Sequence, residues 1–410
     1  MKVLVLSSVY ATPNLPNFGR MIRERIRRVG GRADVVVVAP YPWFPMNAWL
    51  RGREWSGVPD VEERDGLVVH HRRFFSIPRF LKSLDGFLYF LSVLPLVRRL
   101  HRAHRFDLID AHFAYPDGLA AVLCGRLLGL PVMITLRGSI VRLATYRLHR
   151  PQLRTALAGA AGIVAVSESL KTVAIGLGTP AGKVRVLPNG VDGDQFRPLD
   201  QGEARRELGL PEHDRILLSV GTLNEGKGHH RILEALPEIL RAHPDTLYVI
   251  VGGERRGDNY RPTLDRLVER HGLQGHVRMV GERPHRELPR WLAAADLFCL
   301  ATRSEGWSNA IMEALACGRP VVATRVGGNP EIVRTDDLGI LVPPEHDALV
   351  AGIKAALERR WDREAIAAHA RGYSWDAVAD AVVDEWTSLA KSRTTAGPSV
   401  SRPAHGGMAP

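Results

Sequence analysis

Two glutamates eight residues apart form the most informative chemical pattern in this chain. Glu305 stands in a polar loop after an apolar run, 297–300, and Glu313 stands inside the segment 309–317, which has helical spacing. Eight helical steps return a side chain to within about 80° of its starting direction. Both carboxylates can therefore face one cleft, with Glu305 at the mouth of the helix and Glu313 further inside it.

The start of the same predicted helix is suited to holding phosphate. Ser308, Asn309 and Ala310 lie at its first turn, where backbone N–H groups have no partner inside the helix. A second loop, 327–331, follows the next apolar run and begins with two glycines, which let backbone approach a ligand closely. In open α/β sheets, ligands bind at this carboxyl end of the strands. An ordinary helix with exposed glutamates is the alternative explanation.

These two motifs resemble those of the family 4 retaining glycosyltransferases. The stretch EGWSNAIMEALACGRPVVAT carries both glutamates, GGNPEIV follows it, and the resemblance extends over residues 1–390. It implies the GT-B fold, an α/β architecture of two Rossmann-like parallel-sheet domains that face each other across a cleft. It also implies that Glu305 contacts hydroxyls of a nucleotide-sugar donor and that Glu313 binds the ribose of its nucleotide.

A glycine-rich turn forms a second predicted phosphate site. Residues 216–220 predict a strand, and the turn 221–228 contains Gly221 and Lys227 ahead of a predicted helix. Backbone amides of such a turn surround phosphate oxygens, and the lysine neutralises their charge. The spacing does not fit a Walker loop.

The resemblance leaves one phosphate contact open and suggests one contact to the base. Relatives often carry an arginine directly after the first glycine of this turn, where this chain has Thr222, so Arg255 or Arg256 is a candidate replacement. Arg283 follows another predicted strand, 277–280, at the place where relatives pack the nucleotide base. We expect its guanidinium to stack on that base; an ordinary surface arginine is the alternative.

In similar glycosyltransferases the loop around Gly19 faces the donor phosphates or the acceptor, so this glycine is a candidate contact. It lies between a predicted strand, 3–7, and a predicted helix, 20–29, and this order of strand, glycine loop and helix suits phosphate binding. The fingerprint Gly-x-Gly-x-x-Gly is missing from this part of the sequence, which argues against a dinucleotide-binding dehydrogenase.

His112 and Arg137 are the catalytic candidates of the first half. Each belongs to the end of a predicted strand, 106–113 or 130–136, where the cleft is expected. The resembled family often has a His-Gly-Ser triplet after the second of these strands, with the histidine directed at the donor sugar, and this chain has Arg137 there. Arginine cannot act as a general base near neutral pH, but it can stabilise a phosphate or hydroxyl. His112 is the remaining titratable candidate nearby.

The order of predicted elements divides the chain into two domains and a tail. Strands and helices alternate as in parallel sheets. The resemblance implies that residues 1–190 form an N-terminal, acceptor-side Rossmann-like domain and that residues 191–373 form a nucleotide-sugar-binding one. An amphipathic helix, 374–390, is expected to pack back onto the first domain. The Ser-, Pro- and Gly-rich residues 391–410 are expected to be disordered.

The composition limits the compartment and the class of protein. A chain of 410 residues can hold two domains, and its three cysteines lack metal-site spacing, which favours a reducing cytoplasm. The start, MKVLVLSSVY, predicts a strand and not a signal peptide. The longest apolar run, 87–97, is shorter than the about 20 residues that a membrane-spanning helix needs. The sequence 192–194, Asp-Gly-Asp, matches a metal motif of another glycosyltransferase fold but lies in the linker, so we expect metal-independent chemistry.

The positive charge is concentrated in the first half. Residues 1–190 carry a net charge of +15 and residues 191–410 carry a net charge of −4, which together give the +11 of the whole chain. A basic half suggests an anionic partner such as a lipid surface, a phosphate-bearing acceptor or nucleic acid; arginine-rich genomic composition is the alternative. Residues 72–105 combine basic clusters with an aromatic-rich run. A helix in a membrane interface has this pattern, and so does a core helix with a solvated basic face.

Together these features predict a retaining glycosyltransferase that moves a sugar from a nucleoside-diphosphate sugar to an acceptor hydroxyl. We expect a sugar or lipid-linked acceptor, in cell-surface polysaccharide or glycolipid synthesis, reached in the cytoplasm at the inner face of the plasma membrane. A GT-B nucleotide-sugar epimerase is an alternative. A nucleic-acid-binding protein is disfavoured because the sequence has no helix-turn-helix, RRM or zinc pattern.

Overall fold

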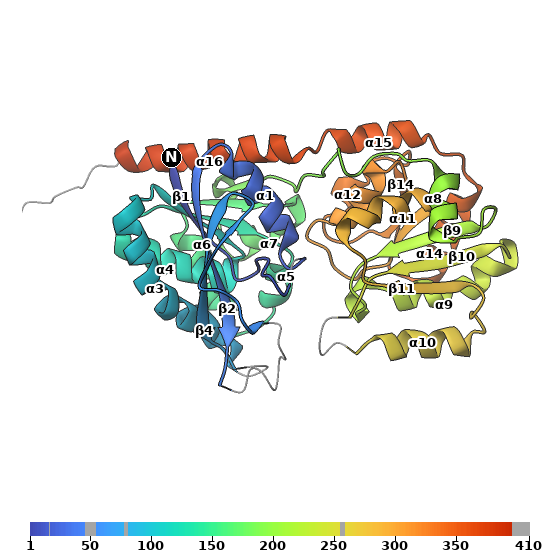
Figure 1. Ribbon diagram of the computed structural model, residues 1–410, viewed down its shortest axis with the longest axis horizontal. Helices are drawn as coiled ribbons and strands as arrows, with labels where there is room; N and C mark the ends of the chain where they lie inside the picture. The colour runs from blue at the N-terminus through green and yellow to red at the C-terminus, as the bar shows by residue number, and fades with distance from the viewer. Residues whose placement is uncertain (16, 46–54, 78–80, 255–258, 396–410) are drawn as a thin grey trace, which may run out of the picture.

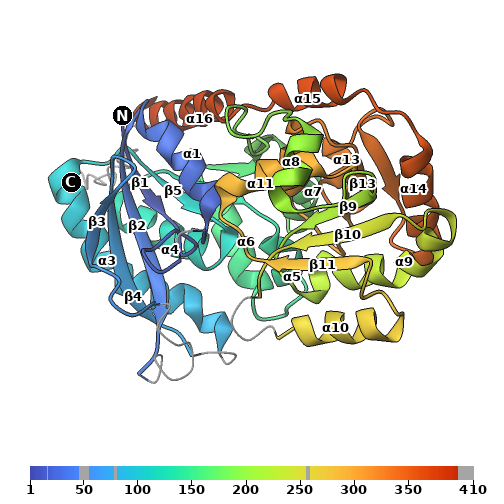
Figure 2. The ribbon, with the colours of Figure 1, turned by 45° about the vertical axis from the view of Figure 1, so that its right-hand side comes forward.

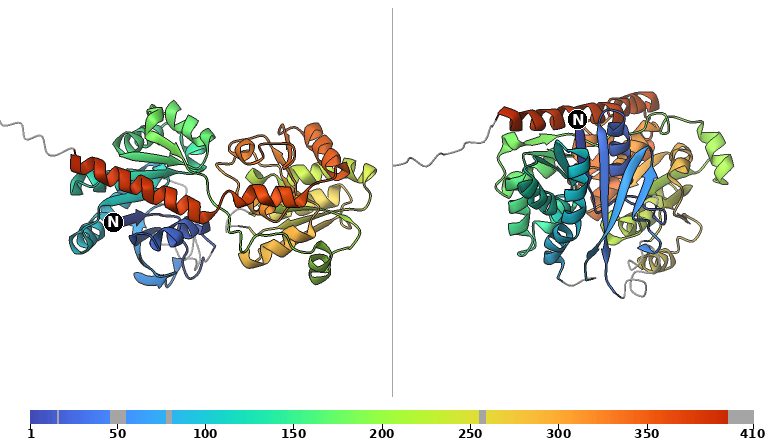
Figure 3. Two further views of the ribbon diagram at one scale, coloured as in Figure 1. Left: turned by 90° about the horizontal axis from the view of Figure 1, so that it is seen from above. Right: turned by 60° about the vertical axis from the view of Figure 1, so that its left-hand side comes forward.

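The chain folds into two α/β domains that lie side by side, with a long C-terminal helix that runs back along the first of them (Figures 1 and 3). This arrangement is seen in a computed structural model, which describes residues 1–15, 17–45, 55–77, 81–254 and 259–395. The expected α/β architecture of two parallel-sheet domains is confirmed.

The first domain is built on an eight-stranded sheet in the order β3-β4-β2-β1-β5-β6-β7-β8. Neighbouring strands are parallel except β3 and β4, which form an antiparallel hairpin. The strands are β1 (Lys2–Leu6), β2 (Asp34–Trp43), β3 (Val61–Arg64), β4 (Leu67–Phe75), β5 (Leu108–His112), β6 (Val132–Leu136), β7 (Gly162–Ala165) and β8 (Val184–Val186).

Helices cover both faces of this sheet, so its central strands are apolar on both sides. In β1, Val3 and Val5 belong to the apolar cluster that includes α1 and α16, whereas Leu4 and Leu6 belong to the cluster on the opposite face with α3 and α4. The helices are α1 (Arg20–Gly30), α3 (Asp85–His104), α4 (Leu119–Leu128), α5 (Ser139–Leu143), α6 (Arg150–Gly159), α7 (Glu168–Gly176) and α16 (Trp375–Thr395).

The second domain is built on a six-stranded sheet in the order β11-β10-β9-β12-β13-β14, with all pairs parallel (Figure 2). Its strands are β9 (Arg215–Val220), β10 (Thr246–Val251), β11 (Val277–Gly281), β12 (Leu297–Leu300), β13 (Val321–Thr324) and β14 (Gly339–Val342). Its helices are α8 (Gln201–Leu208), α9 (His229–Ala242), α10 (Arg261–Arg270), α11 (Leu288–Ala294), α12 (Asn309–Ala316), α13 (Asn329–Ile332), α14 (His346–Glu358) and α15 (Arg363–Arg371).

The edge of the first sheet differs from the sequence expectation. Apolar spacing predicts one strand over 65–73, but the structure has the two strands of the β3–β4 hairpin, joined at Asp65 and Gly66. Both turn residues have positive φ, 55° and 74°. Asp-Gly is a preferred pair for such a two-residue turn because its twist matches that of the strands.

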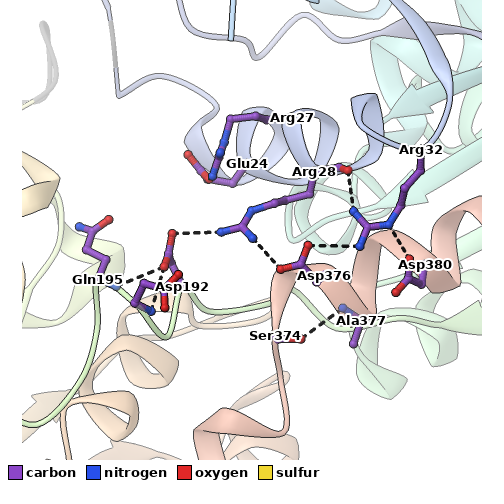
Figure 4. A network of polar contacts seen from close by, with 11 residues as sticks. Glu24, Arg27, Arg28, Arg32, Asp192, Gln195, Ser374, Asp376, Ala377 and Asp380 are labelled. Atoms are coloured by element: carbon purple, nitrogen blue, oxygen red, sulfur yellow. Dashed lines mark hydrogen bonds and ion pairs between the residues drawn. The ribbon is translucent and has the colours of Figure 1, made fainter. Parts of the chain in front are cut away.

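The chain passes between the domains twice, and the two crossings touch. Val191, in the first crossing, forms an isolated parallel bridge with Ser374, in the second. Arg28 of α1 fastens both crossings to the first domain: it pairs with Asp192 at 3.3 Å and with Asp376 at 2.6 Å (Figure 4). α16 then packs against α1 through its buried side chains in the same apolar cluster. The two crossings, fastened to α1 in this way, form the linker between the domains, here called the pivot.

Among the helices within the described ranges, none combines the length and the apolar character needed to cross a bilayer. The apolar run 87–97 belongs to α3, which buries one face in the first domain through Tyr89, Phe90, Val93, Val97 and Leu100. Of the expected disordered tail, residues 391–395 continue α16, and residues 396–410 lie outside the described residues.

Candidate active site

The two motif glutamates lie at the carboxyl end of β12. Glu305 stands in the loop that follows this strand, and α12 begins at Asn309. Ser308 caps the helix, since its side chain accepts a hydrogen bond from the N–H of Ile311 at 3.4 Å. Glu313 lies inside the helix and is only 6% exposed. Both carboxylates therefore belong to the same loop–helix unit after β12.

Lys227 and Glu305 form an ion pair in the second domain. The distance from Lys227 Nζ to Glu305 Oε1 is 2.5 Å. Asn224 holds the turn that carries the lysine by accepting the Lys227 backbone N–H at 3.1 Å. A third of the lysine side chain remains exposed, and an ammonium group has three N–H donors. The pair can therefore offer a cation and a carboxylate to the same ligand.

A cavity of about 790 Å³ lies between the domains, beside the turn that carries Lys227. Gly221 connects the two features, because it lines the cavity and packs against the Lys227 side chain. The volume lies within the about 300–1,000 Å³ that is typical of small-molecule sites. The lining residues of the first domain are Asn14, Leu15, Asn17, Phe18 and Trp55, and those of the second include Gly221, Thr222, Gly252, Gly253, Glu282, Arg283 and Leu288.

Glu313 is held by groups from both domains. Its Oε1 accepts from Arg20 of α1 at 2.8 Å and from His285 of the second domain at 3.0 Å. Gln195 holds the imidazole from the other side, with its amide 3.0 Å from His285 Nδ1. Burial alone would raise the pKa of Glu313, but the charge of Arg20 and the hydrogen bond from His285 bring this pKa below its usual value. The group is therefore a carboxylate at neutral pH.

His112 is fully buried, and Arg137 is 9% exposed. Arg137 approaches His112 Nδ1 at 3.4 Å. Burial, and then the charge of Arg137, lower the pKa of His112 well below its usual value, so this imidazole is neutral at pH 7. Burial also lowers the pKa of Arg137 to about 9, which leaves it protonated at pH 7. His112 is therefore shielded from solvent and contacts Arg137.

Asn189 connects Arg137 to the first residue of α12. Its Oδ1 accepts from Arg137 at 3.2 Å, and its Nδ2 donates to Asn309 Oδ1 at 3.0 Å. Because Asn309 is the first residue of α12, the arginine of the first domain and the N-terminus of α12 are held in one hydrogen-bonded chain. Asn189 itself is buried.

Arg283 lies at the cavity, whereas Gly19 packs against backbone of the first domain. Arg283 lines the cavity, and its guanidinium carbon lies 5.9 Å from the ring centroid of Trp291. Gly19 has φ +69°, and a Cβ atom there would lie 2.2 Å from the carbonyl oxygen of Val9. Gly19 therefore contacts backbone, and this close approach sets the position of Arg20, the first residue of α1.

Two further sequence features are the candidate phosphate arginines and the Asp-Gly-Asp motif. Arg255 and Arg256 lie outside the described residues. Asp192 accepts the backbone N–H of Asp194 at 3.1 Å and pairs with Arg28 at the pivot. In the part of the chain that the structure describes, no group of three or more His, Cys, Asp or Glu side chains is arranged to hold a metal ion.

Sequence reasoning missed four residues that shape this site: Arg20, His285, Asn189 and Asn17. Asn17 donates to Glu282 across the cavity at 3.1 Å. Arg20 had a usable signal, since it follows Gly19 directly and lies outside the apolar stripe of its helix. His285 and Asn189 had none, because their partners are distant in the sequence.

Comparison with known proteins identifies the family. Residues 200–373 match the model of the glycosyl transferases group 1, and residues 57–195 match that of glycosyltransferase family 4. The chain is 32% identical to a D-inositol 3-phosphate glycosyltransferase of Segniliparus rotundus over 69% of this chain and 66% of that protein. It is 30% identical to D-inositol 3-phosphate glycosyltransferase 2 of Catenulispora acidiphila over 80% and 82%. It is 29% identical to a putative teichuronic acid biosynthesis glycosyltransferase of Bacillus subtilis over 86% and 88%.

Solved structures share the whole fold at low identity. Sucrose-phosphate synthase from Thermosynechococcus elongatus superposes with a TM-score of 0.78 at 21% identity, over 96% of this chain and 100% of that chain. The Anabaena protein HepE in complex with UDP superposes with a TM-score of 0.72 at 23% identity, over 95% and 100%. The same protein has also been solved with UDP-glucose.

Proposed function

The chain belongs to the group 1 and family 4 glycosyltransferases, and from this premise we propose that it transfers a sugar from a nucleoside diphosphate to an acceptor hydroxyl with retention at the anomeric carbon. The observation that carries the proposal is the ion pair of Lys227 and Glu305 beside the interdomain cavity, with the buried, ionised Glu313 on the helix that follows Glu305. A cation and two carboxylates there match the three parts of such a donor: diphosphate, sugar and ribose.

The proposed chemistry depends on stabilising the leaving diphosphate. Lys227 and the backbone amides at Ser308–Ala310 would bind its oxygens as the bond from the anomeric carbon to the phosphate oxygen breaks. The acceptor oxygen forms the new bond on the same face of the sugar. Its proton passes to the departing phosphate, which serves as the base. Glu305 would hold sugar hydroxyls during this step, and Glu313 Oε2 would accept from the ribose.

Arg137 is proposed to assist from the first domain. It stands where relatives often have histidine, and its protonated guanidinium would stabilise a donor hydroxyl or phosphate oxygen. The neutral, buried His112 would act as its support. We expect the charge on the diphosphate to be carried by these cations and amides without a divalent metal, so chelation with EDTA should leave the rate unchanged. A rate lost on chelation and restored by Mg²⁺ or Mn²⁺ would contradict this part.

Uridine nucleotides are the first candidates for the donor, since the similar HepE structures contain UDP and UDP-glucose. The decisive measurement is the melting temperature of the protein with a panel of nucleotide sugars. We expect one or a few of them to raise it, and Glu313→Gln to abolish the rise. No rise with any nucleotide sugar or nucleoside diphosphate would contradict the proposal.

A nucleotide-sugar epimerase on the same fold is distinguished by its products. An epimerase converts the stabilising nucleotide sugar without an acceptor, whereas a glycosyltransferase requires one and releases the nucleoside diphosphate. The configuration at the new glycosidic carbon, read by proton NMR, tests retention. An inverted product would be consistent with sugar transfer but would contradict the same-face mechanism.

We further propose that the first domain docks on an anionic membrane surface, where a lipid-linked acceptor would be reached. α3 buries one face, but its outer face is exposed from end to end. Phe87 and Leu91, each about half exposed, begin this face, and Arg98 and Arg102 continue it at helical spacing. Apolar side chains followed by arginines on one exposed stripe suit insertion into lipid and attraction to its headgroups.

A further inference from the structure

Glu331 of the second domain contacts the start of α7 in the first domain. Its Oε2 accepts the N–H of Glu168 at 2.7 Å, and its Oε1 accepts the N–H of Ser169 at 3.0 Å. Ser167, the capping residue of this helix, accepts the N–H of Leu170 at 3.3 Å. Each of the first three N–H groups of α7 therefore has an acceptor, and two of the three are supplied by the other domain.

The loop that carries Glu331 also supports the backbone of Glu305. The N–H of Gly328 donates to the carbonyl of Glu305 at 3.2 Å. Gly327, at φ +52°, lies so close that a Cβ atom there would be 1.8 Å from the same carbonyl oxygen. On its other side the loop approaches the first domain, where a Cβ at Gly328 would be 3.2 Å from Ser167 Cβ. The loop 327–331 is therefore in contact with Glu305 and with α7 at once.

A second close approach lies beside this loop. Gly306, directly after Glu305, packs against Gly138 of the first domain: a Cβ at Gly306 would be 2.8 Å from the backbone N of Gly138. The backbone next to Glu305 therefore touches the backbone next to Arg137. Such contacts exist only while the domains are closed on each other at this point.

We propose that Glu331 is a positioning residue, which couples closure of the domains to the placement of Glu305 and of its partner Lys227. A carboxylate at a helix N-terminus gains from the helix dipole and from charge-assisted hydrogen bonds. When the domains separate, Glu331 loses its hydrogen bonds to the N-terminus of α7. The loop 327–331, which contacts Glu305, then has no support from the first domain. The contact between the domains does not depend on the proposed reaction; only its effect on transfer rests on the proposed function.

A substitution in the first domain can remove one of the two hydrogen bonds between α7 and Glu331. Glu168 is the first residue of α7, and Ser167 before it is extended at φ −158° and ψ 157°. Proline is favoured at this first position, and an extended residue suits the position before it. Glu168→Pro therefore deletes the N–H that donates to Glu331 and keeps the helix. Glu168→Ala keeps the N–H and is the reference, because it removes the same side chain.

The first measurement is small-angle X-ray scattering of the full chain, ligand-free and with UDP. We expect Glu331→Ala and Glu168→Pro to increase the radius of gyration relative to wild type and to Glu168→Ala. The loss of a charge-assisted hydrogen bond should lower the ratio of closed to open molecules by about tenfold. Glu269→Ala, on the exposed face of α10, is the control in the second domain. Wild-type scattering from both test variants without ligand would overturn the proposal, whether or not the protein binds nucleotide.

The second measurement is the rate of sugar transfer from the nucleotide sugar that raises the melting temperature. Glu331→Ala and Glu168→Pro should each lower kcat/KM by about tenfold, with melting temperatures near that of the reference. Because both act on one contact, the double variant should be no slower than Glu331→Ala alone. Losses that multiply in the double variant, or a Glu168→Pro rate equal to that of Glu168→Ala, would refute the coupling.

Discussion

Arg20 of the first domain donates to Glu313 of the second domain at 2.8 Å, although 293 residues separate them in the chain. His285 binds the same carboxylate oxygen at 3.0 Å. The carboxylate expected to bind ribose is thus oriented, and kept ionised, by groups from both sides of the site. The two domains therefore meet at Glu313 as well as at the pivot.

Glu313→Gln should weaken nucleotide binding. The amide keeps the shape of the side chain but removes the charge, and a hydrogen bond to a charged group is worth roughly 1.5–3 kcal/mol. We expect the Kd of the stabilising nucleotide, measured by calorimetry, to rise by about tenfold or more. Glu269→Gln, exposed on α10, is the control. Unchanged affinity would remove Glu313 from the binding site.

Lys227→Ala should reduce transfer much more than stability. The ammonium group is needed most when the diphosphate departs, so kcat should fall by about 10²-fold or more. Because the lysine is a third exposed, its ion pair with Glu305 contributes little to folding. The rate and the melting temperature are compared with those of Lys354→Ala, on α14. A loss of melting temperature that accounts for the lost activity would instead identify Lys227 as structural.

Gly19→Ala should destabilise the first domain more than Gly209→Ala destabilises the second. Both glycines have positive φ, +69° and +59°, but only at Gly19 would the new Cβ meet backbone, 2.2 Å from Val9 O. The shared left-handed conformation costs about 1–2 kcal/mol in each variant, and the contact adds to it only at Gly19. Urea denaturation measures both free energies of unfolding. Equal losses would show that the contact with Val9 relaxes without cost.

The buried carboxyl of Asp117 should make stability depend on pH. Burial raises its pKa to about 7, whereas the unfolded value is about 3.9. Between these two values the folded state holds a proton that the unfolded state has lost, so this group's contribution to stability falls as pH rises. Asp117→Asn removes that dependence.

The melting temperature of Asp117→Asn, relative to wild type, should therefore be higher at pH 8 than at pH 5. A difference of 1 kcal/mol corresponds to roughly 2–4 °C for a large domain. Asp336→Asn, at an exposed site, controls for general charge effects. A wild-type-to-variant difference that is the same at both pH values would contradict the raised pKa.

Sedimentation with lipid vesicles tests the membrane surface. Binding should require anionic lipid and fall with salt, since each basic residue near such a surface contributes about 1 kcal/mol. It should drop when four arginines of α3 and its end become Glu (Arg98, Arg99, Arg102 and Arg105), and when Phe87 and Leu91 become Ser. Glu at Arg261, Arg266 and Arg270 of α10 is the control for charge reversal on another part of the surface. Wild-type protein that stays in the supernatant with anionic vesicles at low salt would remove the membrane proposal and leave the transfer reaction standing.

Much of the architecture was determined by local sequence. Apolar runs of four to six residues became buried parallel strands within one to three residues of the expected ends, as at 297–300. α12 begins where Ser308 caps it, because a capping side chain and the first helical N–H groups are neighbours in the chain. The GT-B fold and the glycosyltransferase family were both predicted from such local motifs, and both are confirmed.

The partners of the site residues were decided only by the tertiary structure. Nothing near Glu313 in the sequence indicates Arg20 or His285, and nothing near Glu331 indicates the N-terminus of α7. These contacts depend on how two separately folded sheets are set against each other at the pivot, where Arg28 binds both crossings. Periodicity and capping report forces within one element. The forces that place Arg20 on Glu313 act between side chains whose distance is set by the packing of the whole chain.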